Sequence, residues 1–130
     1  MKRIITFGTF DVFHIGHVRI IERAARLGSE LYVGVSSDAL NFSKKGRYPM
    51  YNEQARMDIV MAMKGVTHVF LEESLELKKE YIQDYEANIL VMGDDWAGKF
   101  DWVKDACEVV YLPRTEGVST TQLMQEAKER

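Results

Sequence analysis

The sequence predicts an α/β domain built on a five-stranded parallel sheet with helices on both faces. Short apolar runs rich in Ile, Val, Leu and Phe alternate along the chain with segments whose apolar residues recur at helical spacing. The apolar runs are nearly continuous, which is typical of strands that are buried on both faces of a parallel sheet. Because strands that alternate with helices of about 10–15 residues imply βαβ crossovers, we expect a doubly wound, Rossmann-like arrangement.

In the first half of the chain, residues 4–7 form a β-rich run that ends at a glycine, and we expect the first strand there. Apolar residues then recur at helical spacing over residues 18–27, so a helix should follow and end at the next glycine. Residues 31–35 have the composition of a buried strand. Residues 38–51 are polar and basic, show no period and contain a glycine and a proline, so we expect a loop.

In the second half, Asn52 is a typical N-cap residue, and the helix that it begins should place Arg56, Ile59, Val60 and Met63 on its inner face. Further apolar runs indicate more strands, and helical spacing indicates more helices. The expected strands are residues 66–71, 89–92 and 109–112, and the expected helices are residues 77–85 and a last helix that begins near residue 119.

The composition indicates one globular domain covering residues 1–130, since 46% of the residues are apolar and a disordered chain would lack that content. The net charge of −3 argues against binding to a nucleic-acid backbone, which needs a basic surface. No apolar run approaches the roughly 20 residues of a membrane helix, so we expect no membrane insertion. The single cysteine, Cys107, fits the reducing cytoplasm, where we expect the protein to act.

The predicted fold also predicts the position of a ligand site. In open α/β sheets, ligands bind beyond the carboxyl ends of the strands, where the strand order reverses. The segments that follow the expected strands therefore hold the candidate site. They are residues 8–17, 36–51, 93–100 and 113–121.

The first of these segments contains two histidines three positions apart, His14 and His17, with Gly16 between them. It follows a strand and begins a helix, where backbone amides and the helix dipole favour phosphate. Gly16 lets a bulky ligand approach the backbone closely. A lone histidine is usually structural, whereas a pair framed by glycines after a strand favours a phosphate site.

The last segment, residues 114–121, has the sequence Arg-Thr-Glu-Gly-Val-Ser-Thr-Thr. Hydroxyl residues at the start of a helix act as caps, and there they can also donate to triphosphate oxygens. Simple capping needs one hydroxyl and leaves the consecutive hydroxyls, Arg114 and Gly117 unexplained. We therefore expect this segment to bind phosphate as well.

These motifs resemble a known family. Residues 8–17 resemble the signature of the nucleotidylyltransferase superfamily, whose core is His-x-Gly-His. Residues 114–121 resemble the cytidylyltransferase version of the superfamily's second motif, with Val in place of the commoner Ile. Residues 91–101 and 107–113 are similar to the matching parts of bacterial glycerol-3-phosphate cytidylyltransferases, so the resemblance covers nearly the whole chain.

The resemblance implies transfer of a cytidylyl group from CTP to sn-glycerol 3-phosphate, giving CDP-glycerol and pyrophosphate for cell-surface polymers such as teichoic acid or capsule. It also implies a homodimer and a requirement for Mg²⁺ or another divalent cation, held mainly by the triphosphate. The residues alone leave three alternatives open. These are another phosphorylated alcohol as acceptor (phosphoethanolamine, phosphocholine or another polyol phosphate), an adenylyltransferase, and a non-catalytic nucleotide sensor.

The resemblance also implies roles for particular residues. The catalytic residues would be His14, His17 and Arg114. The nucleotide-binding residues would be these three together with Gly8, Thr9, Phe10, Gly16, Asp95, Trp96, Thr115, Glu116, Gly117, Val118, Ser119, Thr120 and Thr121. From the residues alone, Asp95 and its acidic neighbour could instead cap a turn. Asp11 could either help to hold the metal ion or hydrogen-bond within its own turn.

A basic segment supplies candidates for acceptor binding. Lys44, Lys45 and Arg47 on their own are typical of a solvated surface, but beside a triphosphate they would form a lid that neutralises charge. The resemblance implies that Lys44 contacts the acceptor phosphate, and Arg56 and Lys78 are further candidates that could equally be surface residues. Which of Lys45 and Arg47 faces the nucleotide is left open.

Overall fold

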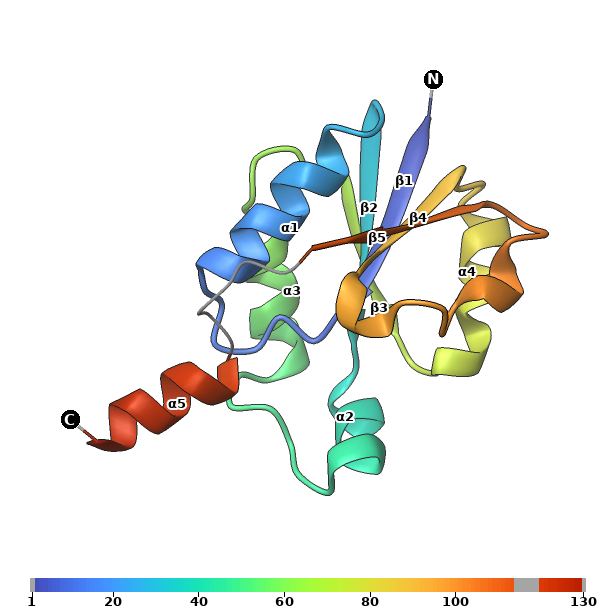
Figure 1. Ribbon diagram of the computed structural model, residues 1–130. Coiled ribbons are helices and arrows are strands. Elements are labelled where there is room, and N and C mark those ends of the chain that lie inside the picture. The colour runs from blue at the N-terminus through green and yellow to red at the C-terminus, as the bar shows by residue number, and fades with distance from the viewer. Residues whose placement is uncertain (1, 114–119, 130) are drawn as a thin grey trace.

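The computed structural model describes residues 2–113 and 120–129 and has the predicted α/β fold, with a five-stranded parallel sheet (Figure 1). The strand order is β3-β2-β1-β4-β5, and every pairing between neighbouring strands is parallel. From β1 the chain adds β2 and β3 on one side and then β4 and β5 on the other, so the strand order reverses between β1 and β4. The strands are β1 (Arg3–Gly8), β2 (Glu30–Ser36), β3 (His68–Glu72), β4 (Ile89–Gly93) and β5 (Glu108–Leu112).

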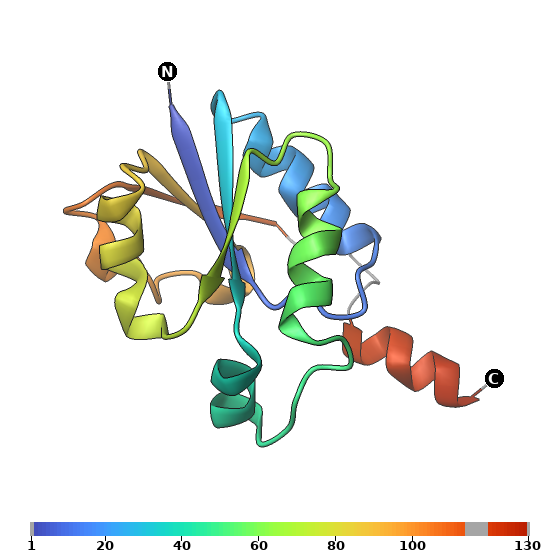
Figure 2. The same cartoon turned by 180° about the vertical axis from the view of Figure 1, so that it is seen from behind.

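Helices cover both faces of this sheet. Figures 1 and 2 show α1 and α3 on one face and α4 on the other, while α5 extends away from the sheet. Within the described part of the chain, no helix is both long and apolar enough to cross a membrane. The helices are α1 (Ile15–Ala25), α2 (Asp38–Lys45), α3 (Glu53–Met61), α4 (Lys78–Asp84) and α5 (Thr120–Glu129), and short 3₁₀ turns lie at η1 (Leu75–Leu77), η2 (Asp94–Trp96) and η3 (Asp101–Val103).

The two faces of the sheet bury separate apolar clusters because successive strand residues point to opposite faces. Ile4 packs with Ile21 of α1 and Val60 of α3. Its neighbour Ile5 packs on the other face with Ile82 of α4. Strands buried on both faces are what the continuous apolar runs predict, and this prediction is confirmed.

One expected loop is partly helical. Residues 38–51 lack an apolar period, yet α2 occupies residues 38–45. The Ser37 side chain caps its start by accepting a hydrogen bond from the backbone N–H of Leu40, and Gly46 ends the helix in the left-handed conformation at φ 72°. Because Asn41 is the only buried residue of α2, no apolar stripe marks this helix in the sequence, and only its caps could have revealed it.

Candidate active site

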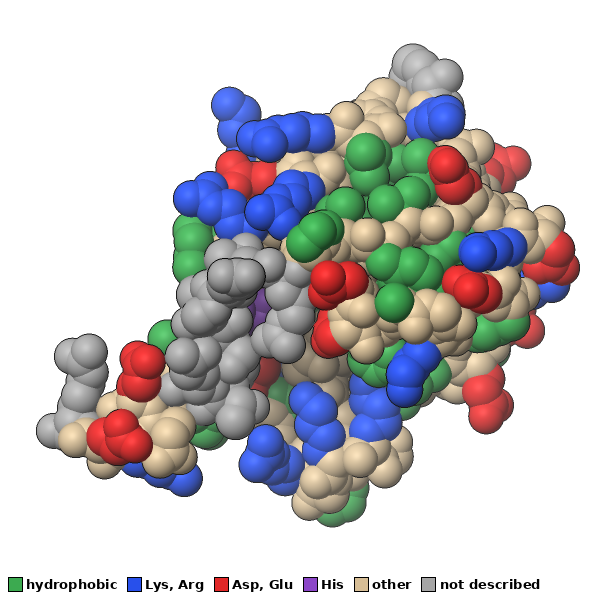
Figure 3. All heavy atoms as spheres, in the orientation of Figure 1, with side chains coloured by type: hydrophobic (Ala, Val, Ile, Leu, Met, Phe, Trp, Pro, Cys, Tyr) green, Lys and Arg blue, Asp and Glu red, His purple; other side chains and the backbone are tan. Residues whose placement is uncertain are grey.

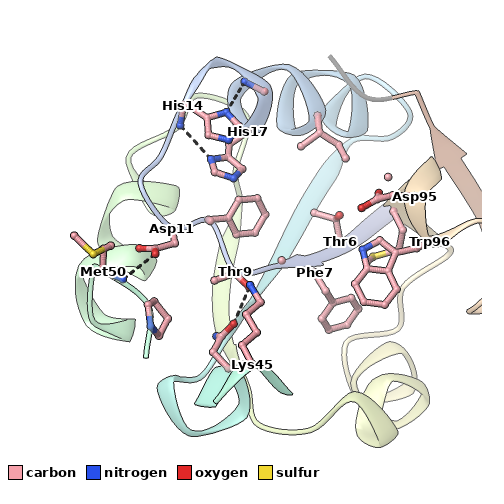
Figure 4. Close-up of a pocket in the computed structure, with 18 of the residues that line it drawn as sticks. Thr6, Phe7, Thr9, Asp11, His14, His17, Lys45, Met50, Asp95 and Trp96 are labelled. Atoms are coloured by element: carbon pink, nitrogen blue, oxygen red, sulfur yellow. Dashed lines mark hydrogen bonds between the residues drawn. The ribbon is translucent and has the colours of Figure 1, made fainter. Parts of the chain in front are cut away.

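A cavity of about 400 Å³ lies beyond the carboxyl ends of β1 and β4, where the strand order reverses (Figure 4). This is the edge that the predicted fold assigns to the ligand. Figure 4 shows His14 and His17 on one side of the cavity and Asp95 and Trp96 on another. The lining includes every residue within 2–113 that is expected to bind nucleotide, namely Gly8, Thr9, Phe10, His14, Gly16, His17, Asp95 and Trp96.

The two histidines form the N-terminal cap of α1. The Nδ1 atom of His14, the N-cap residue, accepts a hydrogen bond from the backbone N–H of Gly16 at 3.0 Å. The Nδ1 atom of His17 accepts one from the backbone N–H of His14 at 3.1 Å. This is a capping box made by two imidazoles, so the three-residue spacing of the motif is the spacing from the N-cap to the third helical residue.

The same hydrogen bonds determine what the imidazoles can offer a ligand. A neutral imidazole whose Nδ1 accepts carries its proton on Nε2, so we assign an Nε2–H donor to each ring. Burial, and to a smaller extent the neighbouring His14, lower the pKa of His17 to about 4, so His17 is neutral near pH 7. The rings are stacked with centroids 3.9 Å apart. The cavity therefore presents neutral N–H donors that the backbone holds in place.

The segment between β1 and α1 is held in a strained conformation. Phe10 and Val12 have positive φ angles of 55° and 46°, which is unusual for any residue with a Cβ and most costly for the β-branched valine. Between them, the Asp11 carboxylate accepts hydrogen bonds from the backbone N–H groups of Met50 and Tyr51, at 2.8 and 2.9 Å. Asp11 thus connects this segment to the segment that precedes α3. This long-range contact is neither of its two expected roles, which were metal binding and a hydrogen bond within its own turn.

A smaller cavity of about 110 Å³ lies beside the larger one. Phe7, Gly8, Thr9, Met92 and Trp96 line both cavities and form a shared wall. Lys44 and Lys78, two of the residues expected to bind the acceptor, line the smaller cavity and not the larger one. The structure thus places these two lysines next to the pair of histidines, on the other side of the shared wall.

Lys78 is almost completely buried in this second cavity and is 1% exposed. Its Nζ lies 2.6 Å from Oε2 of Glu72 and stands over the rings of Phe7 and Phe100, 4.3 and 4.6 Å from their centroids. Burial lowers the pKa of Lys78 and raises the pKa of Glu72, and the attraction between the two groups opposes both shifts. Lys44 adds a second ammonium facing Glu72, and desolvation lowers its pKa too.

Lys45 and Arg47, two more residues expected to bind the acceptor, line the larger cavity and not the smaller one. Figure 3 shows Lys and Arg side chains gathered over α2 and the following segment. Both residues therefore face the cavity that contains the histidines. This placement favours the nucleotide over the acceptor as their ligand.

Arg56 does not have the position expected of an acceptor ligand. It is 0% exposed and lines neither cavity. Its guanidinium donates to the backbone carbonyls of Thr9, Ser36 and Tyr51 and forms an ion pair with Asp38 at 2.7 Å. Arg56 is thus a structural residue that joins the ends of β1 and β2 to α2 and α3, and its expected role in binding the acceptor is corrected.

The remaining expected site residues divide into two groups. Asp95 and Trp96 belong to the 3₁₀ turn η2, whose N-cap residue is Gly93, and both line the larger cavity. Residues 114–119 lie outside the described residues, as do the side chains of Thr120 and Thr121, which begin α5. The expected roles of Arg114, Thr115, Glu116, Gly117, Val118 and Ser119 stay predictions.

Sequence reasoning missed two residues of the site, Glu72 and Asn41. Glu72 ends an apolar strand at the ligand-binding edge of the sheet, and this position was a usable signal. Asn41 is buried, donates to Ser36 Oγ at 2.9 Å and accepts from Thr9 Oγ1 at 3.0 Å. Since α2 was expected to be a loop, nothing in the sequence placed Asn41 beneath the shared wall.

Comparisons with known proteins identify the family of this chain. The cytidylyltransferase-like family model matches residues 5–126. The glycerol-3-phosphate cytidylyltransferase of Bacillus subtilis (strain 168) is 49% identical over 97% of this chain and 97% of its own length. The glycerol-3-phosphate cytidylyltransferase of Staphylococcus aureus (strain NCTC 8325 / PS 47) is 40% identical over 97% of this chain and 95% of its own length.

A solved structure shares the fold. The lipopolysaccharide core biosynthesis protein from Thermoplasma volcanium GSS1 matches with a TM-score of 0.71 and 24% sequence identity. The match covers 88% of this chain and 97% of that one. At this identity, the likeness concerns the arrangement of strands and helices and not the chemistry of the site.

Proposed function

This chain belongs to the cytidylyltransferase-like family, and we propose that it transfers the cytidylyl group of CTP to sn-glycerol 3-phosphate, forming CDP-glycerol and pyrophosphate. Relatives named for this activity are 49% and 40% identical over nearly the full chain. The product would supply glycerol phosphate for cell-surface polymers such as teichoic acid. The activity joins two anionic substrates, so the site must hold two phosphate groups in contact.

The observation that carries this proposal is the pair of cavities with a shared wall. The larger one, about 400 Å³, falls within the usual range of small-molecule sites and contains the imidazole donors of His14 and His17. The smaller one, about 110 Å³, suits a substrate of a few carbon atoms and contains the ammonium groups of Lys44 and Lys78. CTP in the first and the acceptor in the second would bring the acceptor phosphate into contact with the α-phosphorus where the two cavities adjoin, beside Thr9 and Trp96.

The reaction is an in-line displacement at phosphorus. An oxygen of the acceptor phosphate attacks the α-phosphorus of CTP and forms a new P–O bond. The bond from the α-phosphorus to the bridging oxygen of the β-phosphate breaks, and pyrophosphate leaves with that electron pair. Because the second pKa of a phosphate ester is about 6, the acceptor is already an anion near pH 7 and no general base is needed. The protein contributes positioning and charge stabilisation.

His14 and His17 are the proposed source of that stabilisation. Their Nε2–H groups would donate to the α-phosphate and to the bridging oxygen, where negative charge grows in the transition state. A neutral donor binds the ground-state triphosphate less strongly than a cation does, so more of its effect is available at the transition state. Arg114 would secure the nucleotide, and the hydroxyls of Ser119, Thr120 and Thr121 would hold the β- and γ-phosphates.

A divalent cation, Mg²⁺, is part of the proposal. Mg²⁺ usually keeps several waters and binds through one or two carboxylates together with substrate phosphates. Residues 2–113 and 120–129 contain no group of three or more His, Cys, Asp or Glu side chains that could hold a metal ion, which fits an ion held mainly by the triphosphate. Asp11 and Asp95 are the carboxylates that line the larger cavity, and they are the candidates for protein contact. When bound, the ion would neutralise charge on the leaving pyrophosphate.

The test is an assay that crosses nucleotides with acceptors. CTP and ATP are each combined with sn-glycerol 3-phosphate, phosphoethanolamine, phosphocholine and a pentitol phosphate, and pyrophosphate release is measured. With CTP, we expect kcat/KM for glycerol 3-phosphate to exceed that for phosphoethanolamine by about 10²-fold or more. The smaller cavity contains two ammonium groups, of Lys44 and Lys78, and one carboxylate, so its net positive charge repels the ammonium of phosphoethanolamine. A higher kcat/KM for phosphoethanolamine would overturn the assignment of glycerol 3-phosphate as the acceptor. A preference for ATP would overturn the assignment of CTP as the nucleotide.

We also propose that the protein is a homodimer, as the family resemblance implies. Apolar side chains around the segment between α2 and α3 are exposed, with Tyr48 at 64% and Met50 at 67%, and they offer a surface that a second copy could cover. Sedimentation or light scattering across a range of concentrations decides the oligomeric state. The cytoplasmic location stays a prediction that rests on the single cysteine.

A further inference from the structure

Glu72 is a buried carboxylate, and the proposed mechanism assigns it no role. It ends β3, is 2% exposed and lines the smaller cavity. Its Oε2 accepts a hydrogen bond from Lys78 Nζ, and no other hydrogen bond to this carboxylate comes from the described residues. Since no buried side-chain N or O atom among those residues lacks a hydrogen-bond partner, the other oxygen, Oε1, must be accessible from the cavity.

The chemistry of the cavity limits what can meet this oxygen. A carboxylate oxygen accepts hydrogen bonds and repels phosphate, so the phosphate of a ligand must lie away from Glu72, towards the shared wall. An ammonium group would be attracted to Glu72 but repelled by Lys78, which is 2.6 Å from the same carboxylate, and by Lys44. A hydroxyl group can donate to Oε1 without bringing charge into the cavity. The arrangement therefore fits an alcohol whose phosphate points towards the larger cavity.

We propose that Glu72 recognises a hydroxyl group of the acceptor and thereby selects a polyol phosphate over phosphates that lack hydroxyls. This inference rests on the proposed function, because it assigns the smaller cavity to the acceptor. Glu72 serves two groups at once: Oε2 holds the Lys78 ammonium, and Oε1 accepts from the acceptor hydroxyl. A residue that only neutralised Lys78 would not distinguish one acceptor from another.

The test compares two acceptors that differ only in their hydroxyl groups, sn-glycerol 3-phosphate and propyl phosphate. The measured quantity is the ratio of their kcat/KM values with CTP in a single enzyme preparation. Because both values share the same concentration of active enzyme, the ratio is unaffected by partial unfolding of a variant. A site that hydrogen-bonds a substrate hydroxyl discriminates strongly against an analogue that lacks it, and we expect the unaltered protein to prefer glycerol 3-phosphate by about 10²-fold or more.

Glu72→Gln is the informative variant. Lys78 can only donate hydrogen bonds, so the amide oxygen of Gln must face Lys78 and its NH₂ group must face the cavity. The cavity then presents a donor where it had an acceptor. We expect the preference for glycerol 3-phosphate to fall by about 10- to 100-fold, the usual range for a hydrogen bond to a charged group. Glu72→Asp, which keeps the charge but withdraws the oxygens by one methylene, should give an intermediate ratio.

The matched control is Glu73→Gln. Glu73 is the next residue along the chain and is exposed, so this variant makes the same chemical change outside the cavity and should leave the ratio unaltered. A Glu72→Gln ratio equal to that of the unaltered protein would overturn the proposal, even if both rates fell, because that result means a structural role only. Failure of the unaltered protein to form CDP-glycerol would instead overturn the proposed function.

Discussion

The two cavities offer different donors to the phosphate groups that we propose they bind, although Thr9 and Trp96 line both. In the larger one, the imidazoles of His14 and His17, whose Nδ1 atoms are fixed by backbone N–H groups, lie in the same cavity as the cations Lys45 and Arg47. In the smaller one, the donors are ammonium groups, and Lys78 is held by a buried carboxylate. In the proposed reaction, negative charge develops at the nucleotide phosphate in the larger cavity, whereas the acceptor phosphate is a dianion from the start.

This difference predicts different kinetic roles for the two cavities. Cations bind a dianion well in the ground state, so Lys44 and Lys78 should act mainly on the acceptor KM. Neutral donors strengthen as charge grows, so the histidines should act mainly on kcat. Variants in the two cavities test whether these effects on KM and on kcat are separate.

The largest expected effect comes from Arg56, which supports both cavities through the carbonyl of Thr9. Arg56→Met should lower the free energy of unfolding by about 3–5 kcal/mol, since it breaks a buried ion pair and leaves backbone carbonyls without a donor. Urea denaturation measures this loss. The KM values for CTP and for glycerol 3-phosphate should change together, if they change at all. A rise in the acceptor KM alone, at nearly unchanged stability, would restore Arg56 as an acceptor ligand.

The variant His17→Asn should keep the N-terminal cap of α1 and remove the donor that we propose acts in the reaction. The Asn side-chain oxygen can take the place of Nδ1 and accept from the backbone N–H of His14, but the variant lacks the Nε2–H donor. We expect kcat to fall by about 10²–10³, the scale for losing one oxyanion-type donor, with a nearly unchanged melting temperature. His17→Ala should lose both the donor and the cap. Near-normal turnover of the Asn variant would show that His17 acts only as a cap.

The buried, neutral state of His17 also predicts how stability depends on pH. The pKa of His17 is about 4 in the folded protein, against about 6.5 in the unfolded chain. Between these values the unfolded chain takes up a proton that the folded protein does not, so the free energy of unfolding should fall as the pH is lowered from 6.5 to 4. The contribution of this residue is about 3 kcal/mol in total.

The same variant provides the control for the pH dependence. The difference in unfolding free energy between the unaltered protein and His17→Asn should be constant above pH 7. It should then shift in favour of the variant as the pH falls towards 4, because Asn does not titrate. Parallel curves over this range would mean that His17 has an ordinary pKa in the folded protein. The conclusion that burial keeps His17 neutral would then be wrong.

The sequence predicted the parts of this molecule that depend on short-range patterns. The parallel sheet followed from the continuous apolar runs, and the position of the larger cavity followed from the parallel sheet. His14 and His17 were predicted as site residues from their position after a strand, and Asp95 and Trp96 from the family resemblance. The structure brings all four to one cavity. The N-cap at Asn52 followed from residue type alone and is confirmed.

What the sequence did not predict depends on contacts between segments far apart in the chain. Arg56 has the same appearance in the sequence whether it is exposed to a ligand or surrounded by carbonyls from Thr9, Ser36 and Tyr51. Neither the pairing of Glu72 with Lys78 nor the cavity that they share follows from a local pattern. Lys44 and Lys45 are neighbours in the sequence, but they line different cavities because the helical conformation of α2 directs their side chains differently.

These two lysines provide the last test, with the smallest expected effect and the closest control. Both belong to the last turn of α2 and both are exposed, but Lys44 lines the smaller cavity and Lys45 the larger one. Lys44→Ala should raise the KM for glycerol 3-phosphate by about 10- to 100-fold, the range for losing a charged hydrogen bond, and should leave the KM for CTP nearly unchanged. Lys45→Ala should do the reverse. Steady-state kinetics with each substrate varied at saturation of the other measures both values. If each variant weakened both substrates equally, the lysines would act as one diffuse positive patch, and the assignment of one substrate to each cavity would not hold.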